Sequence, residues 1–138
     1  MFENSKNFFI VMEYASNGDL LSYVKDIGPL TEQKGRVIFR QVVEGIKHCH
    51  LKKILHRDIK LDNILLDGEF SVKICDFGVS RFIKKGNYIR EQCGTPAYIA
   101  PEIIKDKGYE GFSADLWSLG VLLYVMISGT FPFTADNL

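Results

Sequence analysis

Four polar residues in the middle of the chain have the types and the spacing needed to handle a phosphoryl group. Asp58, Lys60 and Asn63 lie close together in the segment 56–63, and Asp76 opens the Asp-Phe-Gly tripeptide. Carboxylate and amide oxygens suit Mg²⁺, which usually shares its coordination with phosphates and water. A lysine supplies positive charge where a phosphoryl group develops negative charge, and the remaining carboxylate can orient a hydroxyl and accept its proton. A purely structural role explains these residues less well, because charged residues are rarely buried unless they are paired.

A predicted β-hairpin positions these residues. The runs Ile64–Leu66 and Ser71–Cys75 are rich in strand-forming residues and flank Asp67-Gly68, a dipeptide typical of tight hairpin turns. The segment 56–63 enters the hairpin and Asp76 follows its second strand. The hairpin therefore delivers the second aspartate to the loop that carries the other three residues.

Helices are predicted on both sides of the hairpin. Asn17-Gly18 marks a turn before a short helix over residues 19–25. Thr31 caps a long helix in which Ile38, Val42, Ile46 and Cys49 recur at the spacing of one helical face.

Two further apolar segments complete the predicted elements. The unbroken run Phe8–Met12 indicates a buried strand. A second long helix is predicted to begin at Ala114, with Ser113 as its cap, and to end near Ile127, before Gly129.

Composition argues against several functional classes. The 17 basic and 17 acidic residues cancel, so no basic face indicates nucleic-acid binding. The longest apolar run, 119–127, is less than half of the ~20 residues of a membrane span, and the interrupted run 2–12 is no signal peptide. Three cysteines without a CxxC pair fit reduced thiols, so we expect a cytoplasmic protein, with the nucleus as the alternative. The string His48-Cys49-His50 lacks a second ligand cluster at zinc spacing, so we expect no metal there.

Four motifs in a fixed order resemble the protein kinase family. They are His56–Asn63 as the catalytic loop, Asp76–Gly78 as the metal-binding loop, Ala100-Pro101-Glu102 as the end of the activation segment, and Asp115–Gly120 as the start of the central helix. The resemblance is to eukaryotic serine/threonine kinases, and the pattern around 88–104 is most similar to the calcium/calmodulin-dependent group. It implies an α+β, protein-kinase-like fold. Residues 1–15 would form the last strand of the small lobe and the hinge, and residues 16–138 the first part of the helical large lobe.

The resemblance implies an enzyme that transfers the γ-phosphoryl group of Mg-ATP to serine or threonine hydroxyls of proteins. Asp58 would orient the substrate hydroxyl and act as its base, and Lys60 would neutralise charge on the phosphoryl group. Thr95 would bridge these two side chains, and both Lys60 and Thr95 are typical of the serine/threonine class. Asn63 and Asp76 would hold Mg²⁺.

The same resemblance implies the residues that bind ATP. Met12 would be the gatekeeper at the end of the hinge strand. The backbone carbonyl of Glu13 and the backbone amide of Ala15 would meet the adenine edge. Leu65 would pack under the adenine ring, and the thiol of Cys75 would lie at the back of the pocket.

The resemblance also implies residues that hold the catalytic loop and the activation segment in place. Phe77 would stack on His56 in the hydrophobic spine, beside Gly78 of the metal-binding loop. Asp115 would anchor the catalytic loop from below, and Glu102 would close the activation segment and pair with an arginine of the helices expected after it.

Glu91 occupies the neighbourhood in which many kinases carry a phosphorylated threonine. A carboxylate accepts a bidentate guanidinium bond, so Glu91 could pair with Arg57 of the catalytic loop without any modification. We therefore expect an activation segment that needs no phosphorylation at this position. The alternative is an exposed glutamate of no consequence, since surface pairs often contribute little.

Two acidic residues suggest the substrate preference. In the family geometry, Asp19 and Asp62 approach the residue three places before the phosphorylated one, so we expect a preference for arginine there. Val125, on the central helix, is not acidic, and a second arginine beside it should gain little.

Several family features are missing from the sequence. No Gly-x-Gly-x-x-Gly loop, strand lysine or helix glutamate precedes the hinge, and no further helices follow Phe131-Pro132-Phe133. Because phosphoryl transfer depends on positioning and electrostatics, we expect the isolated chain to be inactive and poorly stable. The alternative hypotheses are a truncated kinase-like binding or decoy module with an unidentified regulatory partner, and a non-functional gene fragment.

Overall fold

A computed structural model describes residues 2–4, 6–84, 88–105 and 107–134. Its helices are α1 (Leu20–Ile27), α2 (Glu32–Leu51), α3 (Pro101–Ile104) and α4 (Gly111–Ser128). Its strands are β1 (Phe2–Glu3), β2 (Phe8–Phe9), β3 (Ile54–Leu55), β4 (Ile64–Leu66), β5 (Val72–Ile74) and β6 (Arg81–Phe82). The strands form antiparallel pairs, β1 with β2, β3 with β6 and β4 with β5. The predicted α+β class is confirmed.

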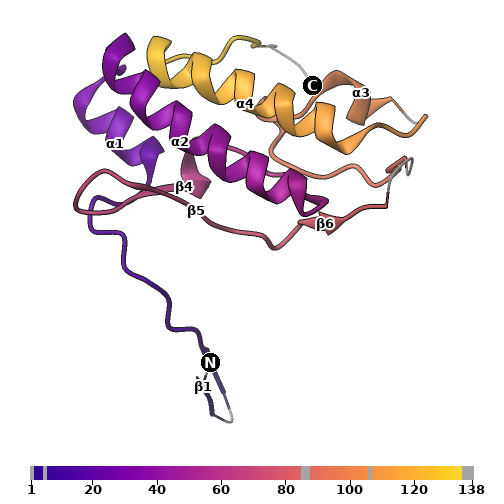
Figure 1. Ribbon diagram of the computed structural model, residues 1–138, viewed down its shortest axis with the longest axis horizontal. Coiled ribbons are helices and arrows are strands. Elements are labelled where there is room, and N and C mark those ends of the chain that lie inside the picture. The colour runs from indigo at the N-terminus through magenta and orange to yellow at the C-terminus, as the bar shows by residue number, and fades with distance from the viewer. Residues whose placement is uncertain (1, 5, 85–87, 106, 135–138) are drawn as a thin grey trace.

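Helices α2 and α4 lie side by side and supply half of the buried residues of the larger hydrophobic core (Figure 1). The Thr31 hydroxyl accepts a hydrogen bond from the Lys34 amide, as expected of the cap of α2. Ile38, Val42 and Ile46 of α2 are buried, while Cys49 is only partly buried. Each such aliphatic side chain stabilises the fold by about 1.5–3 kcal/mol when fully buried. The pair of helices is therefore the platform on which the loops rest.

Helix α4 begins earlier than the sequence suggested. Its cap is Glu110, and Ser113 lies inside the first turn, where its hydroxyl donates to the Glu110 carboxylate at 2.9 Å. The start of the helix fits closely against β3, since a Cβ on Gly111 would lie 1.9 Å from a methyl group of Leu55. At the other end Gly129 adopts φ +74, the left-handed conformation that glycine accepts most readily.

Helix α4 is also more apolar than the run 119–127 indicated. Over its 18 residues the mean hydropathy is 1.4, enough in length and composition to cross a membrane. Half of that window is buried inside the described structure, however, as in the core helix of a globular domain.

The predicted hairpin is present as β4 and β5, with Ile64 opposite Ile74 and Leu66 opposite Val72. The Asp67 side chain closes its turn by accepting the amides of Glu69 and Ser71. A single bridge between Asp19 and Leu65 attaches the hairpin to the start of α1. Because Asp19 caps α1 through the Ser22 amide, the predicted short helix is confirmed and runs two residues further than expected, to Ile27.

The prediction of a buried strand over Phe8–Met12 is wrong. Only Phe8 and Phe9 are in a strand, and Phe8 is 72% exposed. Figure 1 shows that this segment runs away from the helices. Its apolar side chains are exposed because, among the described residues, β1 is the only strand that pairs with it and no helix covers it.

Candidate active site

The Asp58 carboxylate is held by three neighbouring side chains. Its Oδ1 accepts hydrogen bonds from the Thr95 amide at 3.0 Å and from the Thr95 hydroxyl at 2.8 Å. Its Oδ2 lies 2.9 Å from the Lys60 ammonium and accepts from the Asn63 amide at 3.2 Å. Lys60 also donates to the Thr95 hydroxyl at 2.9 Å. The structure thus brings together the side chains of the predicted catalytic set.

These contacts fix the charge states of the pair. Burial raises the pKa of the Asp58 carboxyl, but the hydrogen bonds from Lys60 and Thr95 outweigh it, and the pKa is lowered overall. The hydrogen bond to Asp58 raises the pKa of Lys60. Both groups are therefore ionised at neutral pH, so the carboxylate can accept a hydrogen bond from a hydroxyl and the ammonium can face an anion.

Asn63 and Asp76 lie at the open end of the hairpin, before β4 and after β5, and offer oxygen atoms for a metal ion. Asn63 is buried, and its side-chain amide donates to the backbone carbonyl of Asp58 at 2.8 Å. The backbone carbonyl of Asn63 accepts a hydrogen bond from the backbone amide of Cys75 at 3.0 Å. Asp76 is exposed, has φ +59, and accepts the Gly78 amide at 3.2 Å. Within the described ranges no three acidic, histidine or cysteine residues cluster into a self-sufficient metal site. That donor set fits Mg²⁺, which is usually bound by one or two carboxylates together with substrate phosphates.

The catalytic loop is anchored on helix α4 by Asp115. Its carboxylate is buried and accepts the backbone amides of His56 at 3.0 Å and of Arg57 at 2.9 Å. Arg57 has φ +69, a conformation that costs a non-glycine residue free energy and persists only where neighbours hold it. The rings of His56 and Phe77 lie with centroids 4.8 Å apart. The contacts expected of Asp115 and of the His56–Phe77 stack are present.

A second cluster joins the catalytic loop to the activation segment. The Glu91 carboxylate accepts from Arg57 at 3.0 Å through Oε2 and lies 2.9 Å from Arg81 through Oε1. Arg57 also donates to the Val79 carbonyl. The hydrogen bonds from Arg57 and Arg81 lower the pKa of the Glu91 carboxyl. The Arg57–Glu91 contact that the sequence suggested is therefore made, and Arg81 is added to it.

The residues expected to bind adenine are not enclosed in a pocket. Met12 is 76% exposed in the extended N-terminal segment. Glu13 is exposed and its carboxylate lies 3.0 Å from the Lys73 ammonium of β5, which brings it onto the hairpin. Ala15, Leu65 and Cys75 are half-buried, and burial raises the pKa of the Cys75 thiol. Because these residues are exposed or half-buried, the described residues leave the expected adenine site open to solvent.

Comparison with known proteins places this geometry in a family. The model of the protein kinase domain matches residues 1–138, the whole chain. The chain belongs to the protein kinase family. The kinase chain is 48% identical over 137 residues to "NUAK family SNF1-like kinase 2" of Homo sapiens and of Pongo abelii, and 50% identical to the protein of that name from Rattus norvegicus.

The match covers 99% of the kinase chain but only 22% of the length of these relatives. The predicted family is confirmed.

The remaining residues singled out in this kinase chain lie apart from the Asp58 cluster. The Asp19 carboxylate is engaged as the cap of α1, where it accepts from both the amide and the hydroxyl of Ser22. Asp62 is exposed within the catalytic loop, and Val125 is buried in the core. Glu102 is half-buried in α3 and forms no ion pair with the described residues.

Two residues of the site escaped sequence reasoning. Arg81 follows the Asp-Phe-Gly tripeptide in an unremarkable sequence, and only the pairing of β6 with β3 brings it to Glu91. His50 was considered only as a metal ligand, yet its ring lies 2.7 Å from the Asp115 carboxylate. The position of His50 at the end of the long helix, shortly before the catalytic loop, could have indicated a contact with that loop or its anchor.

Proposed function

We propose that the protein containing this chain transfers the γ-phosphoryl group of Mg-ATP to serine and threonine hydroxyls of protein substrates. The observation that carries the proposal is the Asp58 carboxylate, held between Thr95, Lys60 and Asn63 with its charge retained. An ionised carboxylate kept in one orientation beside an ammonium group suits a reaction in which positioning and electrostatics supply most of the acceleration.

Each side chain has a role in this proposal. The substrate hydroxyl would donate to Asp58, which orients its oxygen for attack and takes the proton as the new bond forms. Lys60 lies close enough to the same carboxylate to face the transferred group and offset its charge. Thr95 holds both in place by donating to Asp58 and accepting from Lys60. Mg²⁺ bound at Asn63 and Asp76 would neutralise phosphate charge, and the hinge residues Glu13 and Ala15 would bind the adenine edge.

The test is phosphoryl transfer by the native protein, purified from its source, to a library of serine- and threonine-containing peptides. We expect transfer that requires ATP and Mg²⁺ and that Asp58→Asn lowers by a factor of about 10² or more. Asp26→Asn is the matched control, since Asp26 is exposed in α1 and has no place in the mechanism. Equal activity of wild type and Asp58→Asn would rule the mechanism out.

The proposal includes an activation segment that is ordered without phosphorylation. Glu91 bridges Arg57 and Arg81 with its two carboxylate oxygens, and its backbone carbonyl accepts the Tyr109 hydroxyl at 3.0 Å. Glu91→Gln and Glu91→Ala should lower transfer, and treatment of the native protein with a phosphatase should not. Loss of activity after phosphatase treatment would mean that a phosphate elsewhere orders the segment.

The proposed substrate preference is for arginine three residues before the phosphorylated position. Asp62 is exposed and is the stronger candidate, because the Asp19 carboxylate is already engaged by Ser22. A peptide array should show enrichment of arginine at that place, reduced more by Asp62→Asn than by Asp19→Asn. An array without this enrichment would refute the assignment.

A binding or decoy module is the second candidate function, favoured by the exposed apolar side chains of Phe8–Met12. We propose that the 138-residue chain alone is inactive, because the described residues leave the nucleotide site open. Transfer by the isolated chain at the rate of the native protein would contradict this. The intact mass of the native protein decides which form to assay.

A further inference from the structure

Three lysines gather where the end of α2 meets β6. Lys52 and Lys53 directly follow α2, and Lys84 is the second residue after β6. The Ile83 amide donates to the Lys53 carbonyl at 2.9 Å, which continues the pairing of β3 with β6 and brings the two segments together. All three lysines are exposed, and none forms an ion pair with another residue that the structure describes.

The two segments that meet here leave this positive charge unbalanced. Neither 51–55 nor 79–84 contains an acidic residue. The C-terminus of a helix favours nearby cations, which explains Lys52 and Lys53 at the end of α2. It does not explain Lys84, which reaches the same place from a different part of the chain. Arg81 is the other cation of these segments, and Glu91 already engages it. The three lysines can therefore bind an anionic partner.

The backbone beneath the lysines is held in place by the fold. Lys53 adopts φ +61, a conformation that costs a non-glycine residue free energy and persists where neighbours hold it. Its amide donates to the His50 carbonyl at 2.8 Å. The Ile83 side chain, next to Lys84, is buried in the same hydrophobic core as Leu55. Because this backbone is ordered before a partner arrives, binding costs less conformational entropy.

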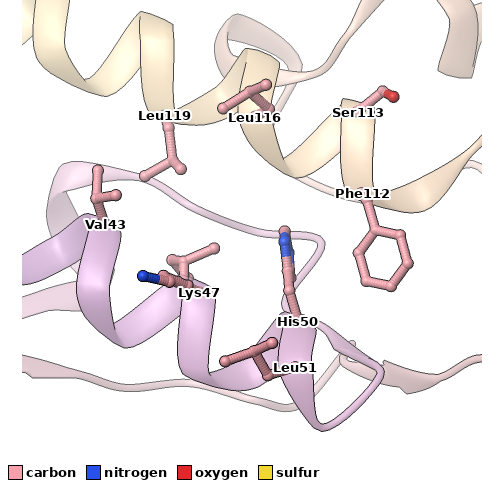
Figure 2. A pocket seen from close by; sticks show the side chains of 9 residues that line it. Val43, Lys47, His50, Leu51, Phe112, Ser113, Leu116 and Leu119 are labelled. Atoms are coloured by element: carbon pink, nitrogen blue, oxygen red, sulfur yellow. The ribbon is translucent and has the colours of Figure 1, made fainter.

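Exposed apolar side chains accompany the lysines. The Phe82 ring in β6 is 63% exposed, and Leu51, which directly precedes Lys52, is 73% exposed. Leu51 lies at the end of α2, where it shares one wall of the groove between α2 and α4 with Lys47 (Figure 2). Water satisfies an ammonium group, but an apolar ring gains free energy when it leaves water. Buried aromatic anchors supply much of the affinity of protein interfaces. Cations beside an exposed ring thus indicate a contact surface.

An acidic protein segment fits this surface better than a nucleic acid or a membrane. Nucleic acids and anionic bilayers are bound by broad basic faces or by longer basic clusters. The 17 basic and 17 acidic residues of this chain cancel, and no basic face was expected from its sequence. Three lysines match a short run of aspartates or glutamates. The exposed ring beside them matches one apolar side chain of the same segment.

We propose that Lys52, Lys53, Lys84 and Phe82 form a docking surface for an acidic segment of a partner protein. Carboxylates of the segment meet the three ammonium groups, and one apolar side chain packs on the Phe82 ring. None of these residues belongs to the Asp58 cluster, so docking does not depend on the proposed phosphoryl transfer.

The experiment measures binding of the native protein to fluorescent, glutamate-rich peptides that each carry one leucine, phenylalanine or tryptophan. We expect binding that needs both the glutamates and the apolar residue. Joint replacement of Lys52, Lys53 and Lys84 by glutamate should weaken it about tenfold or more, because each attraction becomes a repulsion. Phe82→Thr keeps a strand-forming residue but removes the ring, and it should weaken binding about tenfold.

The matched control makes the same change in net charge elsewhere on the surface. It replaces three other exposed lysines by glutamate, and it should bind as wild type does: Lys25, Lys34 and Lys105. Equal losses in the two triple variants would show a general charge effect and overturn the proposal. Failure of wild type to bind any of the peptides would also overturn it.

Two further measurements separate docking from other causes. Higher ionic strength should weaken peptide binding in wild type far more than in the variant with Lys52, Lys53 and Lys84 replaced. Phosphatidylserine vesicles and a single-stranded thymidine oligonucleotide are tested in the same assay. Binding of either one that needs the lysines but not Phe82, in place of peptide binding, would overturn the proposal. Urea midpoints identify any variant that fails to fold, and the other variant then decides.

Discussion

The phenol of Tyr98 offers a sharp test of the packing beneath the short turn Pro96–Tyr98. Tyr98 is 4% exposed, and its hydroxyl has no hydrogen-bond partner among the described residues. Burial raises the pKa of this phenol, and the neighbouring Leu61 backbone offsets that effect only in part. We predict that Tyr98→Phe stabilises the protein, although the substitution removes a polar group from the core.

The magnitude follows from the unpaired hydroxyl. A buried polar group without a partner costs about 1–3 kcal/mol, and the nearby Leu61 backbone places the expected gain at the lower end, about 1 kcal/mol in the free energy of unfolding. The matched control is Tyr109→Phe, because the Tyr109 hydroxyl donates to the Glu91 carbonyl at 3.0 Å. Loss of that bond should destabilise the protein by about 0.5–1.5 kcal/mol. Removal of the hydroxyl should thus raise the free energy of unfolding at Tyr98 and lower it at Tyr109.

The assay is urea unfolding of the native protein, with midpoints compared at unchanged m-value. Tyr98→Phe should raise the midpoint and Tyr109→Phe should lower it. A fall of similar size in both variants would refute the reasoning, because it would mean that the Tyr98 hydroxyl has a partner, such as a buried water, whose loss is felt.

The remaining predictions concern the site and its supports. Thr95→Val should raise the pKa of Asp58, read by NMR titration, because two of the hydrogen bonds that lower it are reduced to one; Thr95→Ser should not. The pKa of Asp58 is lower in the folded protein than in the unfolded chain, so ionised Asp58 should stabilise the fold above pH ~4. This contribution should be lost as the pH falls through the lowered pKa. Acid unfolding should therefore be steeper in wild type than in Asp58→Asn. Gly111→Ala should lower the free energy of unfolding by about 1–3 kcal/mol, because the new methyl group would clash with Leu55. Gly120→Ala should raise it by about 0.5–1 kcal/mol, because the space around its Cβ position is open. Urea unfolding midpoints measure both changes. High salt should weaken activity in wild type more than in Glu91→Ala, because the exposed Glu91 pairs are screened by ions.

The sequence predicted best where local patterns decide the structure. The hairpin over Ile64–Ile74 and the cap at Thr31 follow from turn and cap chemistry, and both are present. The cluster around Asp58 could be anticipated because its motif residues are close in sequence or belong to a recognised family pattern. Gly129 ends α4 as its type predicts.

The failures are contacts that depend on distant segments. Phe8–Met12 has the composition of a buried strand, but burial requires a covering layer that the described residues do not provide. Ser113 has the chemistry of a cap, yet the helix begins at Gly111, where the backbone fits closely against Leu55 of β3. Arg81 and His50 reach their carboxylate partners across the pairing of β6 with β3 and of α2 with α4, which no local pattern specifies.

The exposed N-terminal segment also bears on how this chain behaves while it is being made. Phe8 to Met12 is a proline-free, uncharged run with apolar side chains in solvent and, within the described residues, only the short strand β1 beside it. The unpaired backbone edge of such a run can form β-sheet hydrogen bonds with the same run in other copies, and this pairing leads to aggregation. A chain of these 138 residues expressed alone should therefore accumulate in insoluble form and engage chaperones that hold extended apolar peptides. Replacement of Val11 by lysine should raise its soluble yield.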